Sequence, residues 1–486
     1  MSDAKPDTPA ADHRWLLLAV VGTAQLMIVL DTTIMNIALP SAQRELGFST
    51  SDRQWVITAY ALAFGSLLLL GGRISDLVGR RWPLVIGLLG FAGASALGGA
   101  APSFGWLIGA RAIQGVFAAL LAPAALSTLN VTFPSGADRG RAFGVYAAIA
   151  AGGSVVGLIL GGALTEWLSW RWCLYVNLFF AVPAAYGAYA YARGSDERVK
   201  TSLDLPGAAL ATTGLFCLVY GLSNAQQESW GATLTIAMFA ACVLLLGAFV
   251  LVELRRRDPL LPMRLLADRN RAASYSSIAI AFAGMFSAFL FLTYFLQTSL
   301  DFSPLKTGIS FLPLSAGVAI AAGLTNVRLL PKFGPRPLVP LGFLFAAGGM
   351  LWLAQITPAS TYSADVLGPI ILLGLGLGFA FAPCLNAATD SIDESDAGVA
   401  SAMVNTSQQI GGAVGTAVLS TIFTTAVADY IAENAHTRAL VAQAAVHGYT
   451  TAFSVSAALF AAGLLLSAVV LRSGPLAGSA RSAAVA

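Results

Sequence analysis

The chain has 486 residues, of which 57% are hydrophobic and only 10% are charged, and its formal net charge is +3. Soluble domains carry about 25% charged residues, and no soluble core of this length could hide so much apolar surface. The composition therefore excludes a soluble globular protein, gives no reason to expect a nucleic acid partner, and predicts an integral membrane protein embedded in a lipid bilayer.

Apolar runs between charge clusters predict fourteen transmembrane helices. They cover residues 14–38, 54–72, 83–101, 105–129, 142–164, 170–192, 206–224, 231–253, 272–298, 305–327, 337–356, 363–386, 399–426 and 449–472. The polar residues 1–13 lack the basic region and cleavage site of a signal peptide, so we expect the first helix to be retained. An even number of helices places both termini on one side. Lysine and arginine concentrate in the loops of that side, which predicts cytoplasmic termini in a bacterial inner membrane.

The first predicted helix contains one acidic residue, Asp31. An ionised carboxylate inside a bilayer is costly unless it is paired, and intramembrane acids often serve as proton relays. Asp31 is therefore a candidate coupling group for protons or another cation. A structural role, as a cap or a hydrogen-bond acceptor for a neighbouring helix near the outer mouth, remains an equal alternative.

A short charged loop is expected at residues 72–81, between the second and third predicted helices. It is too short for a domain and too charged for lipid, so two helices should meet there in a tight hairpin. Glycines would let the helix ends approach closely, and Asp76 could accept hydrogen bonds from a helix terminus or an arginine. The predicted gating loop consists of Gly72, Asp76, Gly79, Arg80 and Arg81.

The fourth predicted helix contains Arg111, the one basic residue placed inside a span, with Gln114 three positions later. Residues three apart share a helix face. A guanidinium finds no partner in lipid, so Arg111 must face the bundle interior, a wet cavity or a carboxylate. We expect Arg111 to tune the protonation of a nearby acid such as Asp31, and a purely structural pair between helices is the alternative.

An internal repeat divides the chain. The segment Asp138-Arg139-Gly140 precedes a run with Gly153 and Gly157, and Asp396-Ala397-Gly398 precedes one with Gly411 and Gly415. Duplicated halves with a substrate site between them are common in secondary transporters. The predicted organisation is a cytoplasmic tail (1–13), a six-helix half (14–192), an inserted helix pair with cytoplasmic connectors (193–271), a second six-helix half (272–472) and a cytoplasmic tail (473–486).

Motifs for other energy sources and for enzyme chemistry are missing from the sequence. Gly-Lys never occurs, so no phosphate-binding loop exists and we expect no ATP hydrolysis. Metalloprotease, redox and serine hydrolase signatures are absent, and the four cysteines lack metal-ligand spacing. We therefore expect no enzyme activity, no cofactor and no metal, which leaves ion-coupled or facilitated transport.

Aromatic and amide side chains recur on the predicted helices. Ordinary helix packing explains the aromatics most simply, although some could line an apolar substrate cavity in which the amides orient the substrate. The candidates for such a cavity are Asn36, Trp55, Tyr60, Gln114, Tyr294, Gln297, Asn405 and Gln408.

These motifs together resemble a known family. The loop at residues 72–81 resembles the signature between helices 2 and 3 of the major facilitator superfamily. The segments around Asp31, Trp55, Arg111 and Asn405 resemble the fourteen-helix drug:proton antiporters. The resemblance implies export of amphipathic or cationic drugs or antibiotics in exchange for protons, with halves that rock around a central cavity. It also implies a proton-coupling role for Arg111 and a cytoplasmic gate at residues 72–81.

The same resemblance assigns Gly153, Gly157, Gly161 and Gly162 to the antiporter motif of the fifth helix. Leu158 stands where the family has a proline. Loss of that proline removes a helix-bending residue, which weakens the inference that this helix seals the protein against proton leak.

The sequence therefore predicts an all-α polytopic membrane protein of the major facilitator fold, with fourteen helices as two six-helix halves and two inserted central helices. We expect a proton antiporter that expels a small organic drug or antibiotic. The arginine- and alanine-rich composition suggests an actinomycete-like host, where cephamycin-type β-lactam exporters form one group of this size, but no residue identifies the substrate. A non-transporting membrane sensor of the same fold and a proton-coupled nutrient importer remain as alternatives.

Overall fold

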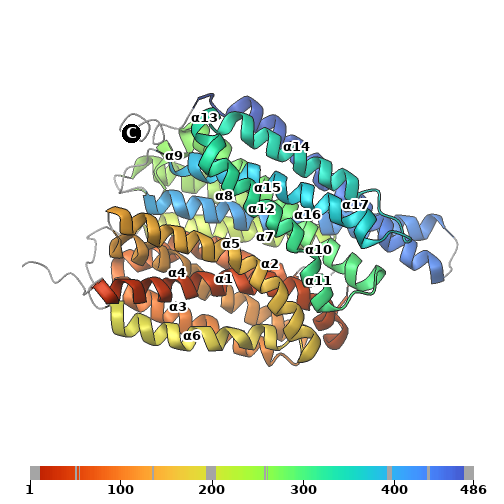
Figure 1. The fold of residues 1–486 in the computed structure, drawn as a ribbon, viewed down its shortest axis with the longest axis horizontal. Coiled ribbons are helices and arrows are strands. Elements are labelled where there is room, and N and C mark those ends of the chain that lie inside the picture. The colour runs from red at the N-terminus through yellow and green to blue at the C-terminus, as the bar shows by residue number, and fades with distance from the viewer. Residues whose placement is uncertain are drawn as a thin grey trace, which may run out of the picture.

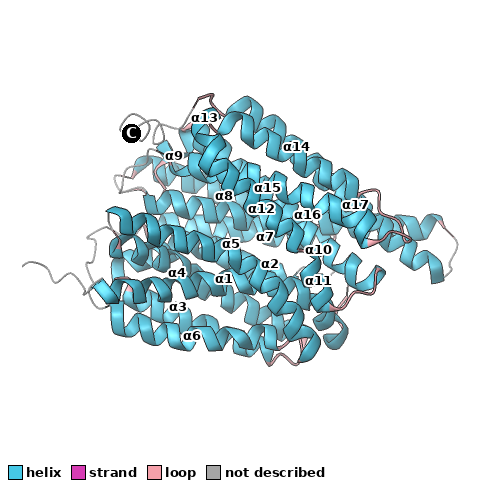
Figure 2. Ribbon diagram, in the orientation of Figure 1, coloured by secondary structure: helices cyan, strands magenta, loops and turns pink. Residues whose placement is uncertain are grey.

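The structure is a computed structural model that describes residues 11–49, 52–53, 55–133, 136–192, 204–256, 259, 261–390, 397–434 and 438–474. Every regular element of these residues is a helix, and they contain no strand (Figure 2). The first part of the chain forms α1(Ala11–Leu46), α2(Trp55–Val78), α3(Arg81–Gly99), α4(Phe104–Thr132), α5(Gly136–Trp167) and α6(Trp172–Tyr191). The middle part forms α7(Leu205–Gln227), α8(Thr233–Arg255) and the short α9(Met263–Ala267).

The last part begins with α10(Arg269–Tyr294), which continues into η2(Phe295–Ser299). It goes on with α11(Pro304–Ser310), α12(Leu312–Leu324), η3(Thr325–Leu329), α13(Leu330–Phe333), α14(Pro335–Leu353), η4(Tyr362–Val366), α15(Leu367–Thr389), α16(Ala397–Glu433) and α17(Arg438–Val470). Among the described residues, 12 helices are long and apolar enough to cross a membrane. Within the described residues α2 counts as a shorter apolar helix over Trp55–Leu68, and α5 is not among the 12, so the expected count of fourteen is not confirmed.

The helices form two bundles that repeat the same pairs of neighbours. In the first bundle α1 packs against α5, α2 against α4 and α3 against α6, and in the second α10 packs against α16, α12 against α15 and α14 against α17. Figure 1 shows the first bundle below the second, with the start of α1 and the end of α17 at the same end of the molecule. We call this end the terminus end and the opposite end the distal end.

Close packing between α2 and α4 sets the position of Arg111 and Gln114. A Cβ added at Gly115 would lie 2.5 Å from the carbonyl oxygen of Tyr60, and one added at Gly71 would lie 2.0 Å from that of Ala119. Only glycine permits so short a distance between two backbones. The face of α4 next to Gly115 is therefore held directly against α2.

The helices differ from the predicted spans at their ends. α1, α16 and α17 extend well beyond the apolar runs, because backbone hydrogen bonding continues where hydropathy no longer marks a helix. The expectation of a loop over residues 72–81 was wrong in extent: α2 continues to Val78 and α3 begins at Arg81. Only Gly79 and Arg80 connect the two helices, and Gly79 has a φ of 89° that favours glycine.

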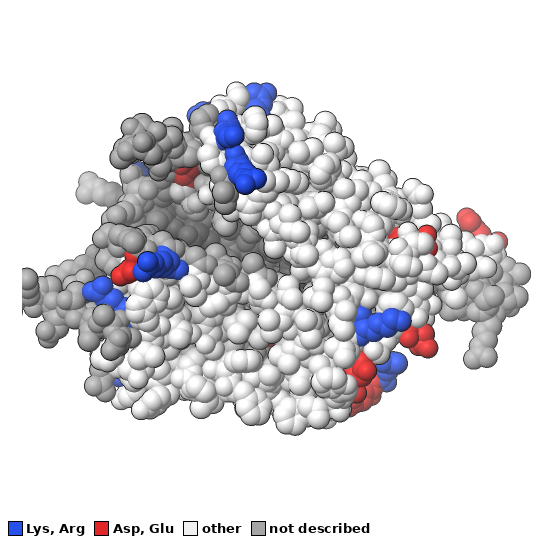
Figure 3. Space-filling view, viewed as in Figure 1, with Lys and Arg blue, Asp and Glu red and all other residues white. Residues whose placement is uncertain are grey.

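The two bundles meet at the distal end. A Cβ at Gly162 of α5 would lie 2.6 Å from the Cα atom of Leu305, and one at Gly308 of α11 would lie 2.2 Å from the carbonyl oxygen of Leu158. Toward the terminus end, Figure 3 shows a hollow between the two bundles on the visible face. The molecule is thus closed between its bundles at the distal end.

Candidate functional site

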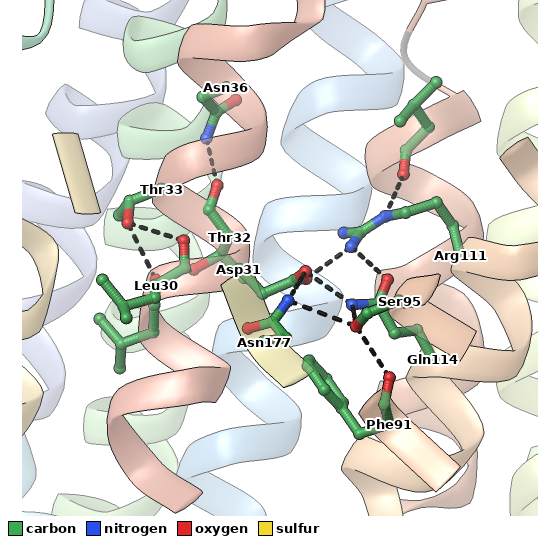
Figure 4. A network of polar contacts seen from close by, with 12 residues as sticks. Leu30, Asp31, Thr32, Thr33, Asn36, Phe91, Ser95, Arg111, Gln114 and Asn177 are labelled. Atoms are coloured by element: carbon green, nitrogen blue, oxygen red, sulfur yellow. Dashed lines mark hydrogen bonds and ion pairs between the residues drawn. The ribbon is translucent and has the colours of Figure 1, made fainter. Parts of the chain in front are cut away.

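A buried carboxylate lies at the centre of the first bundle. Asp31 is in the middle of α1 and is 1% exposed. Its two oxygens receive different donors: Nη1 of Arg111 lies 2.5 Å from Oδ2, and Nε2 of Gln114 lies 2.7 Å from Oδ1. Figure 4 shows the Asp31 side chain pointing from α1 toward α4, where these two partners lie.

The Arg111 guanidinium is surrounded by partners from three helices. Besides Asp31, its Nη1 donates to Oε1 of Gln114 at 2.8 Å and its Nε donates to the carbonyl oxygen of Val56 at 3.1 Å. Its Cζ lies 4.5 Å from the centre of the Tyr60 ring, a distance typical of a cation–π contact. A buried arginine stays protonated, so it needs several partners at once.

Two further polar side chains complete the cluster. Ser95 of α3 accepts a hydrogen bond from Nε2 of Gln114 at 2.7 Å and donates to the carbonyl oxygen of Phe91 at 2.8 Å. Asn177 of α6 donates to Oγ of Ser95 at 3.3 Å and to Oδ1 of Asp31 at 3.5 Å. We call Asp31, Ser95, Arg111, Gln114 and Asn177 the polar cluster.

The polar cluster holds one acid and one base away from water. A buried ion pair persists only where hydrogen bonds satisfy both groups, because desolvation costs several kcal/mol per ion. Here both oxygens of Asp31 are satisfied, and Arg111 also contacts Val56, Tyr60 and Gln114. The site therefore places one buried carboxylate and one buried guanidinium in direct contact between α1 and α4.

The sequence predicted part of this cluster. Asp31, Arg111 and Gln114 were each expected to face the interior, and the structure brings all three together. Ser95 and Asn177 were missed, although each is a polar residue in an otherwise apolar span. Tyr60 is one of the candidates for an apolar cavity, and in the structure its ring lies against the Arg111 guanidinium.

The other cavity candidates do not gather around the polar cluster. Asn36 donates to the carbonyl oxygen of Thr32 on its own helix at 2.9 Å. The Trp55 ring meets the ring of Tyr220 on α7, with centroids 6.2 Å apart. Asn405 and Gln408 are half-buried on α16.

Tyr294 and Gln297 lie where the bundles meet at the distal end. The Tyr294 hydroxyl donates to Oε1 of Gln43 on α1 at 2.6 Å, and Nε2 of Gln297 donates to the carbonyl oxygen of Ile37 at 3.1 Å. Both side chains therefore connect the second bundle to α1 in this conformation.

The expected gating residues make contacts within the first bundle. Nε of Arg80 donates to Oγ of Ser127 on α4 at 2.7 Å, and Cζ of Arg81 lies 4.2 Å from the ring centre of Tyr189 on α6. A Cβ at Gly72 would make only an ordinary contact with Pro123, at 3.6 Å. The side chain of Asp76 lies outside the described residues.

The glycines of the fifth helix form a contact line against α1 and α11. A Cβ at Gly153 would lie 3.2 Å from side-chain atoms of α1, one at Gly157 would lie 1.9 Å from Oγ1 of Thr33, and one at Gly161 would lie 2.9 Å from the Cα atom of Ile34. Gly162 faces α11 instead. These glycines therefore position α1, the helix that carries Asp31.

The chain is similar in sequence to known membrane transporters. The family model of the Major Facilitator Superfamily matches residues 21–416. The puromycin resistance protein pur8 of Streptomyces alboniger is 48% identical over 461 residues, which are 94% of this chain and 90% of the relative. The cephamycin export protein CmcT of Amycolatopsis lactamdurans is 38% identical over 83% of this chain and 84% of the relative. The tetracenomycin C resistance and export protein of Streptomyces glaucescens is 31% identical over 87% of this chain and 79% of the relative.

Solved structures show the same fold at low sequence identity. A bacterial homologue of the human lysosomal transporter Spinster is 16% identical with a TM-score of 0.67, covering 95% of this chain and 98% of that chain. The human organic anion transporter MFSD10 is 16% identical with a TM-score of 0.60, covering 93% of this chain and 99% of that chain.

Proposed function

Because the chain belongs to the Major Facilitator Superfamily of membrane transporters, we propose that it exports a small organic antibiotic from the cytoplasm in exchange for protons. It is a multi-pass bacterial membrane transporter and not an enzyme. Relatives named for resistance to, or export of, puromycin, cephamycin and tetracenomycin C support an antibiotic as the cargo. Their named cargoes differ, so we assign the class of cargo and leave the individual compound open.

The observation that carries the proton coupling is the buried pair of Asp31 and Arg111. Protonation of Asp31 would neutralise its carboxylate and remove the ion pair that connects α1 to α4. Arg111 would keep its contacts with Val56, Gln114 and Tyr60, which would offset part of the cost of losing the carboxylate. The proton gradient supplies the energy, and no ATP or cofactor takes part in this proposal.

The helix that carries Asp31 also forms the contacts at the distal end. Ile37 and Gln43 lie further along α1 and accept hydrogen bonds from Gln297 and Tyr294 of the second bundle. A change in the connection between α1 and α4 can therefore reach the distal contacts through one continuous helix. This arrangement supports a cycle in which protonation of Asp31 alters the closure of the distal end.

The topology belongs to the same proposal. We propose that α2 and α5 also cross the bilayer, giving fourteen spans as two six-helix halves with α7 and α8 inserted between them. The distribution of basic residues supports a cytoplasmic location for the terminus end. The hollow between the bundles would then open toward the cytoplasm, as loading of an export cargo requires (Figure 3).

Everted membrane vesicles test the antiport proposal. After respiration acidifies the vesicle lumen, addition of puromycin should release protons from the lumen, measured by recovery of a quenched acridine dye. Asp31→Asn and Arg111→Ala should each abolish this release. Glu45→Gln breaks a more exposed ion pair of the same bundle, with Arg171 at 2.9 Å, and should retain it.

The alternatives give other results in the same vesicles. Cargo uptake that persists after the pH gradient is collapsed would contradict antiport. Cargo-driven proton movement of the opposite sign would favour a nutrient importer. No response of proton flux to puromycin, lincomycin or tetracenomycin C, with the protein present and folded, would favour a membrane sensor.

We further propose that Asp76 acts as a latch of the cytoplasmic gate. It lies in the last two turns of α2, close to the connection at Gly79. Asp76→Asn should lower the rate of puromycin efflux while the amount of inserted, monodisperse protein stays unchanged. A variant with normal efflux would remove the gating role.

A further inference from the structure

An arginine of the first bundle is enclosed by aromatic rings of the second. Arg53, in the connection between α1 and α2, is 2% exposed. Its Cζ atom lies 3.9 Å from the ring centre of Tyr294, 5.0 Å from that of Phe423 and 5.9 Å from that of Phe291. We call these three rings, from α10 and α16, the aromatic cage.

The cage binds Arg53 as a cation and not as a member of an ion pair. Among the described residues no carboxylate forms a salt bridge with Arg53, and its Nε has no hydrogen-bond partner. Aromatic faces attract a cation most strongly where water is excluded, as it is here. The guanidinium is therefore stabilised by the rings and by a hydrogen bond with the Tyr294 side chain.

The cage keeps its shape through contacts outside Arg53. The Phe423 ring stacks on that of Phe291, with centroids 5.3 Å apart, and on that of Tyr449 at 5.1 Å. These rings all belong to the second bundle, so they stay together when the bundles separate. The hydroxyl of Tyr294 is the exception, because it donates to Gln43 of α1.

We propose that the aromatic cage is a binding site for organic cations, and that Arg53 occupies it as a tethered competitor while the distal end is closed. When the bundles part at the distal end, Arg53 leaves with the first bundle and the cage becomes free. A cationic cargo that takes its place stabilises the distal-open state. This inference rests on the proposed export function and adds to it an exit site with a stated ligand chemistry.

Binding to purified protein in lipid nanodiscs tests the competition directly. The probe is tetraphenylphosphonium, with triphenylphosphine oxide as an uncharged compound of similar shape. Arg53→Ala should increase the affinity for tetraphenylphosphonium by about tenfold, since a cation–π contact in a desolvated site is worth about 1 to 2 kcal/mol. The affinity for the uncharged compound should stay the same. Adding Phe423→Leu to Arg53→Ala should reverse the gain.

Two control variants distinguish the effect of the aromatic cage on binding from the effects of other contacts at the distal end. Tyr294→Phe removes the hydrogen bond to Gln43 and keeps the ring, so the gain caused by Arg53→Ala should persist in its presence. Lys306→Gln removes another distal cation, whose partner ring, Phe302 at 3.7 Å, lies in the same bundle. That variant should leave tetraphenylphosphonium binding unchanged.

Distances between spin labels report whether the distal end is open or closed. The labels are attached to Arg44→Cys on the first bundle and Thr425→Cys on the second, both at exposed positions. Adding tetraphenylphosphonium should produce a population with a longer distance between the two labels. The four native cysteines are buried, which favours labelling at the introduced positions. An unchanged or lower affinity for tetraphenylphosphonium in a folded Arg53→Ala protein would overturn the proposal. Because binding needs no proton gradient, that result is distinguishable from a failure of antiport.

Discussion

At the scale of single residues, the charges of the polar cluster depend on each other for stability. Asp31→Asn leaves Arg111 buried without its carboxylate, and an arginine cannot release its proton to relieve the cost. We expect this variant to lose about 3 kcal/mol of unfolding free energy. The double variant Asp31→Asn with Arg111→Gln should recover most of that loss, because no charge then remains buried.

Unfolding in detergent, followed by tryptophan fluorescence, measures both variants. The single variant should unfold first. The free energy of unfolding of the double variant should approach that of the unaltered protein. A double variant that is no more stable than Asp31→Asn would show that the pair does not act as a unit.

The residues of the cluster were predictable only where the signal was a charge in an apolar span. Asp31 and Arg111 stand out for that reason, and Gln114 follows from helical spacing. Ser95 and Asn177 are small polar residues that many membrane helices carry without a functional role. Their contact with Gln114 and Asp31 depends on how α3 and α6 pack, which no local pattern encodes.

At the scale of helices, the glycines of α5 determine how closely α1 can approach. Gly157→Ala would place a Cβ atom 1.9 Å from Oγ1 of Thr33, so α1 and α5 must move apart. We expect a loss of about 1 to 3 kcal/mol of unfolding free energy and a lower transport rate. Gly152→Ala is the matched control, since a Cβ there would meet nothing within 4 Å. Equal melting temperatures for the two variants would contradict the role assigned to this contact line.

The sequence predicted where helices lie better than where they end. Hydropathy marks the apolar part of α1 or α17 but not the turns that continue into the polar region. The charges at residues 72–81 suggested a loop, yet Arg73 and Asp76 lie on the last turns of α2 and Arg81 begins α3. A helix can carry charged residues wherever it leaves the hydrocarbon layer. Charge alone therefore does not distinguish a loop from the end of a helix.

At the scale of the whole molecule, the repeat in the sequence corresponds to a repeated pattern of helix pairs. The glycine pairs Gly153/Gly157 and Gly411/Gly415 occupy the same position in both bundles, each against the first helix of its bundle. The polar cluster has no such counterpart in the sequence, since the positions of α15 that match Arg111 and Gln114 are Ile371 and Gly374. The proton exchange that we propose would therefore involve the first bundle alone.

The position of the inserted helices could not be predicted. α7 packs against α2 of the first bundle and α16 of the second, and Oγ1 of Thr212 donates to the carbonyl oxygen of Ser66 at 2.9 Å. Hydropathy gives a span its length but not its neighbours. In the structure α7 contacts both bundles and therefore lies across the place where they would move against each other.

We propose that cargo is exchanged for protons through Asp31, and proton release on cargo binding tests this most directly. Purified protein in weakly buffered detergent solution, with a pH-sensitive dye, is mixed with puromycin. We expect the unaltered protein and Glu45→Gln to release protons when puromycin binds, and Asp31→Asn to release none. Release from a folded Asp31→Asn protein that equals the release from the unaltered protein would contradict the claim.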